Sequence, residues 1–163
     1  MREFPALEHL VATASDELVR LAARVVGNTA EAEDVVQDAW AKGLIALRKR
    51  ELADVGVLKT WLYRVVLNGA FNARRGKDRR AERDFAWQQR RTGGSPEALE
   101  AGVALKRVAA MLDDLPDEQA GALVLKELHG MTAAEVAKVL ECSEGAVEQR
   151  LVRARAALRK RFE

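Results

Sequence analysis

The sequence predicts an all-α protein of two small helical domains joined by a basic linker, the C-terminal domain being a helix-turn-helix. Three observations support this fold class. Of the 163 residues, 48% are hydrophobic and 32% are charged, but only 5% are aromatic. Apolar residues recur at the spacing of amphipathic helices, and capping residues stand between the periodic segments. We therefore expect domains at residues 1–76 and 95–163, with the linker at 77–94.

The first domain begins with two expected helices. Residues 6–26 form one helix, or two that are broken near the middle, and Gly27 is a typical helix stop. Asn28, with Glu31 three residues later, offers a cap for a second helix over about 30–47. The apolar positions of this pair are Leu18, Leu21, Ala22, Val25, Val26, Val36, Ala39, Trp40, Gly43, Leu44 and Leu47.

A third helix is expected over about 58–75, after a polar stretch that opens with three basic residues. Its apolar positions are Trp61, Leu62, Val65, Val66 and Phe71. Three amphipathic helices of this length can bury a shared core, so the first domain ends near residue 76. Residues 77–94 lack a clear apolar period and close with two glycines, which indicates a basic linker with some helical tendency.

The second domain opens with a strong helix start. Ser95 can cap, Pro96 suits the first helical position, and an acidic residue follows, so a helix is expected over 97–112. A break at Leu115-Pro116-Asp117 separates it from the next helix, 117–128, which stops at Gly130. That helix presents an apolar face made of Ala120, Leu123, Val124 and Leu128.

The last residues predict a helix-turn-helix. Thr132 and Glu135 form a capping box that opens a short helix, and a tight turn over 141–144 leads to a longer basic helix ending near 161. The inward positions of the two helices are Val136, Ala137, Leu140, Val147, Leu151, Ala154 and Leu158. The longer helix is the candidate recognition helix for the DNA major groove.

Charge is distributed unevenly along the chain although the net charge is only +2. Residues 1–47 and 92–146 are net acidic, whereas 48–91 and 147–163 are net basic. This alternation predicts two separate cationic surfaces, each a possible footprint for a polyanion. Ordinary solvated helix faces would produce the same alternation, and charge alone does not choose between them.

The sequence carries no pattern of an enzyme or of a metal protein. It has no glycine-rich phosphate loop, no paired nucleophile and base, and no clustered metal ligands. The single Cys142 excludes an intramolecular disulfide and is most simply a small turn residue, although a lone thiol could also sense redox state. His9 and His129 are expected to be packing or surface residues. No segment resembles a membrane span or an export signal, so we expect a cytoplasmic protein without cofactors.

The outward face of the recognition helix carries residues that suit DNA. Gln149 could contact adenine, Arg153 guanine or a phosphate, and Arg150 a phosphate; Arg155 flanks this face. Glu148 also flanks it, where phosphates would repel a carboxylate unless it accepts a hydrogen bond from cytosine. The alternative is that this helix only packs and its arginines are solvated.

Two sets of tracts resemble a known family over nearly the whole chain. Residues 32–40 (AEDVVQDAW) and 60–68 (TWLYRVVLN) are similar to the second conserved region of extracytoplasmic-function (ECF) sigma factors. Residues 127–132 (ELHGMT), 135–137 (EVA) and 145–155 (GAVEQRLVRAR), with the preceding Leu-Pro pair, are similar to their fourth region.

The resemblance implies a non-enzymatic initiation subunit of bacterial RNA polymerase that reads the −35 and −10 promoter elements and melts the latter. It further implies three partners: core RNA polymerase, through its large clamp subunit and its flap, promoter DNA, and an anti-sigma factor. The implied polymerase contacts are Asp34, Gln37, Asp38 and Trp40. Those implied for the −10 element are Lys59, Tyr63, Arg64, Asn68, Asn72, Arg74, Arg75 and Lys77, with Asn68 lining the pocket for an unstacked base. Those implied for the −35 element are Ser143, Ala146, Glu148, Gln149, Arg150, Arg153 and Arg155.

The sequence departs from the family pattern at three places. The loop over 48–56 lacks the usual aromatic wedge before the −10 helix, Ala146 replaces a usual threonine, and Glu148 stands where many members have lysine or arginine. Two alternatives therefore stay open. One is a sigma-like decoy that binds only an anti-sigma factor, and the other is a stand-alone helix-turn-helix regulator, for which the acidic helix over 30–47 would have no use.

Overall fold

The chain folds into seven α-helices and one π-helical turn in a computed structural model that describes residues 4–88 and 95–163. The helices are α1 (Phe4–Val26), α2 (Thr29–Arg48), α3 (Val55–Gln88), α4 (Pro96–Asp113), α5 (Asp117–Leu123), α6 (Ala133–Leu140) and α7 (Glu144–Phe162), with the π-helical turn η1 (Val124–Leu128) after α5. The described ranges contain no strand, so the all-α expectation is confirmed.

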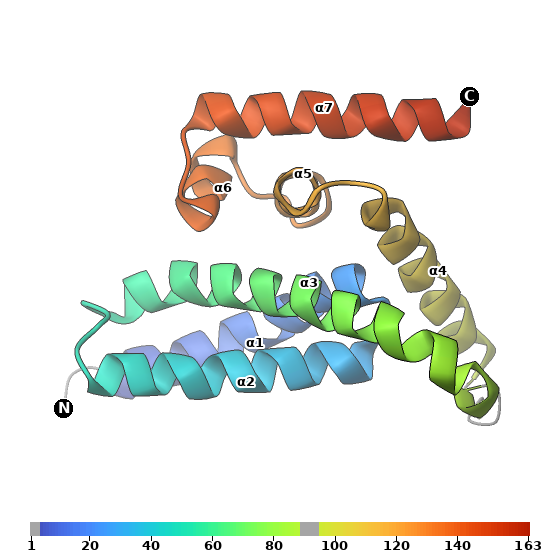
Figure 1. The fold of residues 1–163 in the computed structure, drawn as a ribbon. Coiled ribbons are helices and arrows are strands. Elements are labelled where there is room, and N and C mark those ends of the chain that lie inside the picture. The colour runs from blue at the N-terminus through green and yellow to red at the C-terminus, as the bar shows by residue number, and fades with distance from the viewer. Residues whose placement is uncertain (1–3, 89–94) are drawn as a thin grey trace.

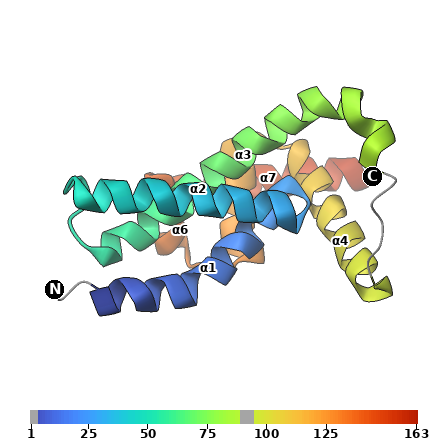
Figure 2. The same cartoon turned by 90° about the horizontal axis from the view of Figure 1, so that it is seen from below.

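The helices form two layers (Figure 1). α1, α2 and α3 pack against one another in the lower layer, and α5, α6 and α7 form the upper layer. α4 joins the layers at one side and packs against α1, as the view from below also shows (Figure 2). α6 contacts α3, so the two layers touch directly.

The boundaries of most helices follow the capping signals. The Asn28 side chain accepts a hydrogen bond from the backbone N–H of Glu31, and Gly27 ends α1 with φ +86°. Ser95 caps α4, and Ser143 caps α7 by accepting from the Ala146 N–H. Thr132 forms both halves of the predicted capping box with Glu135. These side chains satisfy backbone donors that have no partner within the helix, which is why the caps fix where the helices begin.

The third helix is longer than expected. α3 begins at Val55 rather than near residue 58 and continues to Gln88, so residues 77–88, where the sequence predicts a linker with some helical tendency, are helical. Gly76 does not end the helix, because a glycine inside a helix lowers its stability without breaking it. Residues 89–94 lie outside the described ranges. The boundaries of the two domains stay a prediction.

Two residues expected in the core are exposed instead. Leu44 is 41% exposed because the buried stripe of α2 follows Val36, Ala39, Gly43 and Ala46, and Leu44 lies about 100° from Gly43. Leu128 is 38% exposed because the π-helical turn, closed by a hydrogen bond from the His129 N–H to the Val124 carbonyl, adds a residue and turns it outward.

Both layers share one hydrophobic core. Leu18, Leu62 and Val66 from the first domain are continuous with Leu125 and Leu151 from the second. The layers also approach closely at Gly121 of α5, where an added Cβ would lie 3.1 Å from the Leu67 side chain and 3.9 Å from that of Phe71. The two expected domains are therefore packed together in this structure.

Candidate nucleic-acid interface

The acidic start of α2 forms an exposed surface. Asp34, Gln37 and Asp38 are all exposed, while Trp40 is half-buried against the core. Asp38 forms an ion pair of 2.9 Å with Lys42 one turn later. Since these side chains face solvent on a helix held by Val36 and Ala39, they are free to contact another protein.

The basic side chains of α3 lie at the boundary with the second domain. Arg64 Nε donates to the Val139 carbonyl at 2.8 Å, its Nη2 donates to the Lys138 carbonyl at 3.2 Å, and its Nη1 pairs with Glu141 at 2.8 Å. All three guanidinium nitrogens are therefore bound to the C-terminal end of α6 and the turn that follows. This end carries the negative pole of the helix dipole, which favours a cation.

Further along α3, Arg74 and Arg75 face α4 and α5. Arg74 is only 8% exposed; its Nε pairs with Asp113 at 2.9 Å, and its guanidinium lies 5.0 Å from the centre of the Phe71 ring. Arg75 pairs with Asp117, which also lies 3.9 Å from Arg74 Nη2. The Arg75 side chain also donates to Asn72 Oδ1 at 2.6 Å.

Tyr63, which the resemblance implies as a contact of the −10 element, is buried at the centre of the same boundary. It is 2% exposed, its hydroxyl donates to Glu17 Oε2 at 2.6 Å, and His129 Nε2 lies 3.3 Å from that hydroxyl. Burial and the bond to Glu17 raise the pKa of Tyr63. Burial lowers the pKa of His129, so its neutral form is favoured.

A cleft of about 370 Å³ opens beside these residues between α1, α3 and the second domain. Its lining includes Lys59, Lys138, Glu17 and Glu135, so its charges of both signs balance and do not select an anion. In the part of the chain that the structure describes, no group of three or more potential ligands could hold a metal ion.

Asn68, the candidate base-pocket residue, is exposed on α3. Lys59 is exposed too. The structure thus keeps Asn68 and Lys59 open but brings Tyr63, Arg64 and Arg74 against the second domain. The side chain of Lys77 lies outside those described.

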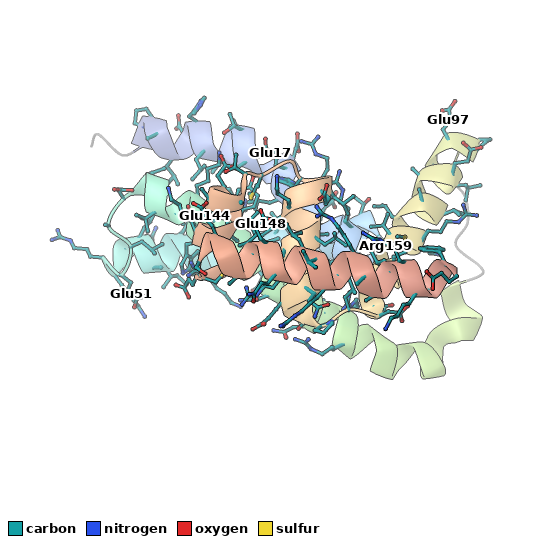
Figure 3. The ribbon with its side chains drawn as sticks, turned by 90° about the horizontal axis from the view of Figure 1, so that it is seen from above. Glu17, Glu51, Glu97, Glu144, Glu148 and Arg159 are labelled. Carbon is teal, nitrogen blue, oxygen red and sulfur yellow. The ribbon has the colours of Figure 1, made fainter. Side chains whose placement is uncertain are left out.

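The recognition helix presents an open face (Figure 3). Glu144 and Glu148 lie at its N-terminal part and Arg159 at its other end. Glu148, Gln149 and Arg153 are exposed, whereas Val147, Leu151 and Ala154 are buried. The predicted inward and outward faces of α7 are confirmed. Ala146 is half-buried, and Ser143 is exposed but uses its Oγ as the cap.

Two arginines of α7 are held within the second domain. Arg150 pairs with Glu118 at 3.5 Å and donates to the Cys142 sulfur at 3.3 Å; Arg155 pairs with Glu127. These bonds fix α7 against α5 and η1. The bond to Cys142 also shows that the thiol, which is half-buried, has a local structural contact.

Sequence reasoning missed the carboxylates that pair with α3. Asp113, Asp117 and Glu141 belong to the acidic block 92–146, whose net charge does not single them out. The opposite net charges of this block and of the basic block 48–91 indicate that the two segments attract each other, but they do not specify which residues pair.

Comparison with known proteins matches both halves of the chain to one family. The family profile described as Sigma-70 region 2 matches residues 10–80, and the profile described as Sigma-70, region 4 matches residues 105–158. The RNA polymerase sigma-H factor of Pseudomonas aeruginosa is 31% identical over 171 residues, which cover 95% of this chain and 85% of that protein. The ECF RNA polymerase sigma-E factor of Escherichia coli is 29% identical over 164 residues, covering 94% and 84%.

Two solved structures have a similar fold. CnrH in complex with the cytosolic domain of CnrY aligns with a TM-score of 0.68 and 28% identity, over 97% of this chain and 88% of that one. The sigma factor RpoE in complex with the anti-sigma factor NepR, from Bartonella quintana, aligns with a TM-score of 0.62 and 20% identity, over 95% of both chains. The second likeness supports the fold alone.

Proposed function

The chain belongs to the sigma-70 family as an ECF sigma factor that recognises promoters. On this premise we propose which of its surfaces bind core RNA polymerase and which bind promoter DNA. The exposed face of α2 binds the clamp of core RNA polymerase through Asp34, Gln37 and Asp38, with Trp40 packed behind them. The negative charges of Asp34 and Asp38 suit a basic protein surface and would be repelled by DNA.

The second domain contacts the −35 element. The single observation that carries this assignment is the exposed row Gln149, Arg153 and Glu148 on a rigidly capped α7, whose opposite face is fully buried. Gln149 and Arg153 contact base edges, and the domain's flanking helices bind the polymerase flap. Arg150 and Arg155 contribute positive charge near the phosphates.

α3 binds the −10 element. Asn68 holds an unstacked base, because its amide offers both a donor and an acceptor on the exposed side of the helix. Lys59, Arg64, Asn72, Arg74 and Arg75 hold the backbone, together with Lys77. These assignments make promoter binding steeply dependent on salt, since each phosphate contact releases counterions.

The family is not a family of enzymes, and we assign this chain no catalysis and no cofactor. Among the residues that the structure describes, no helix is both long and apolar enough to cross a bilayer, which fits action in the cytoplasm. An anti-sigma factor is the expected regulator, since one solved structure of similar fold is described as a complex with such a factor.

The test is co-purification with bacterial core RNA polymerase followed by transcription of genomic DNA with and without this protein. Stable binding and new, discrete start sites are expected, and aligning those sites gives both promoter motifs. Binding without new start sites would instead favour the decoy, and no binding would leave an isolated helix-turn-helix regulator.

A further inference from the structure

One apolar side chain stands on the outward face of α7. Val152 is 62% exposed, and it is the only large apolar side chain exposed between Glu148 and Ala156. The core of this domain takes Val147 and Leu151 from α7 instead. Valine is also a weaker helix former than alanine. Since neither packing nor helix formation accounts for Val152, its position on the helix is what matters.

The neighbours of Val152 are the residues that carry the proposed −35 contact. With about 100° and 1.5 Å per residue, Gln149 lies about 60° around α7 from Val152 and about 4.5 Å along the axis, and Arg153 lies about 100° and 1.5 Å away. Successive bases of one strand are about 3.4 Å apart. Val152 therefore reaches the base pair that Gln149 contacts, or the next one. Arg150 and Arg155 do not intervene, because both pair with carboxylates of their own domain.

The chemistry of a valine selects one feature of the major groove. Among the groups that base pairs present there, the C5-methyl group of thymine is apolar and the others donate or accept hydrogen bonds. Placed against a polar group, Val152 would displace water and leave that group without a partner, which costs free energy. Placed against a thymine methyl group, it removes two apolar surfaces from water. Its branched side chain also has one strongly preferred rotamer in a helix, so little freedom is lost on contact.

We propose that Val152 is a specificity-determining residue, whose methyl groups pack against the C5-methyl group of a thymine in the base pair that Gln149 contacts or in the next one. This inference rests on the proposed −35 role of the second domain. It adds to that role a base requirement that no hydrogen bond supplies. Cytosine has no C5-methyl group, so the contact favours thymine over cytosine at this position.

The test removes the methyl group from the DNA and leaves base pairing intact. Deoxyuridine differs from thymidine by the absence of the C5-methyl group. Each thymine of the −35 motif, on either strand, is replaced in turn, and binding of the duplex to the holoenzyme of this protein with core polymerase is measured by competition. For wild type we expect one position at which deoxyuridine weakens binding about fourfold, the ratio that corresponds to ~0.8 kcal/mol for one buried methyl group.

A variant of the protein then assigns that methyl group to Val152. The Val152→Ala holoenzyme should bind the thymine and deoxyuridine duplexes equally at that position, and should respond like wild type at every other thymine. The matched control is Val103→Ala, the same change at a side chain of α4 that is 50% exposed. The control holoenzyme should keep the fourfold preference. Because Val152 is exposed and alanine is the better helix former, circular dichroism melting should show both variants folded.

Three results would overturn the proposal. The first is a −35 motif without thymine, or one in which no deoxyuridine weakens binding. The second is a Val152→Ala holoenzyme that still distinguishes thymine from deoxyuridine at the sensitive position. The third is a Val152→Ala variant that loses affinity for core polymerase while its preference for thymine is unchanged, since the side chain would then face a protein.

Failure of this inference is distinguishable from failure of the proposed function. A holoenzyme that does not prefer its −35 duplex over a scrambled duplex would refute the −35 role of the second domain, and the inference with it. A holoenzyme that prefers the −35 duplex but is indifferent to every thymine methyl group would refute the role of Val152 alone.

Discussion

The hydroxyl of Tyr63 on α3 donates a hydrogen bond of 2.6 Å to Glu17 on α1, and His129 of the second domain approaches the same oxygen to 3.3 Å. The His129 ring also meets the Tyr63 ring edge-on, with centres 5.4 Å apart. One phenol therefore joins three segments that are far apart in the sequence. Tyr63 and His129 therefore make the stability of the folded protein depend on pH in two different ranges.

At high pH the folded protein should lose stability through Tyr63. The pKa of Tyr63 is raised in the folded state, so above its ordinary value of 10.0 the unfolded chain loses this proton first and gains free energy from doing so. Tyr63→Phe should remove that dependence and, near neutral pH, cost about 1 kcal/mol for the lost hydrogen bond. Urea unfolding across pH measures both effects. Because Tyr63 is the sole tyrosine, its phenolate absorbance directly reports its titration.

At mildly acidic pH the folded protein should lose stability through His129. Its pKa lies below the ordinary 6.5 because burial disfavours the imidazolium; Arg24, Arg20 and Lys59 add repulsion, and Glu17 opposes the shift. As pH falls below 6.5 towards the lower folded pKa, the unfolded chain takes up the proton first, so the stability present above 6.5 is progressively lost. Comparing the pH dependence of urea unfolding in wild type and His129→Gln isolates the contribution of His129 to stability. Equal slopes in both proteins would contradict it.

Gly43 should not tolerate a side chain. A Cβ at this position would lie 2.9 Å from Leu58 Cδ1 and 3.2 Å from Trp61 Cζ3, so Gly43→Ala requires these packed side chains to shift. We expect a loss of about 1–3 kcal/mol in the free energy of unfolding. Gly102→Ala is the matched control, since nothing lies within 4 Å of its Cβ and alanine is the better helix former. That variant should gain up to about 1 kcal/mol.

Asp34→Lys should weaken binding to core RNA polymerase without unfolding the chain. The side chain is exposed on α2, and reversing its charge places a cation where the proposal expects a basic partner surface. Glu33→Lys, an equal change at an exposed neighbour about 100° around the helix, should weaken binding less. Competition binding against a labelled wild-type protein measures the difference. Equal losses would show a general effect of charge rather than a contact.

Asn68→Ala should reduce open-complex formation more than polymerase binding. Asn68 is exposed, so its loss costs little stability and removes only the amide that would hold the unstacked base. Permanganate reactivity of the melted strand measures opening, and co-purification measures binding. An equal fall in both quantities would refute the base-pocket role.

Local signals predicted most of the helix boundaries, although not those of α3, and long-range contacts escaped prediction. The caps at Asn28, Ser95, Thr132 and Ser143 depend on neighbours within three residues, so the sequence contains all their partners. The exposure of Leu128 depends on a π-helical turn that no residue pattern marks.

The same distinction between local and long-range contacts applies to the candidate site. The faces of α7 follow from helical periodicity, and so does the exposed row on α2. The pairing of Arg64 with Glu141 joins residues 77 positions apart, and only the packing of the two layers brings them together. The burial of Tyr63 is completed by His129 from the other domain, so the pattern of α3 alone does not predict it.

The close approach of α5 to α3 at Gly121 has a thermal consequence. Separating the layers would bring water to Leu67 and Phe71, and hydration of apolar surface raises the heat capacity. The free energy of the contact between the layers should therefore change with temperature, because its hydrophobic part weakens on cooling.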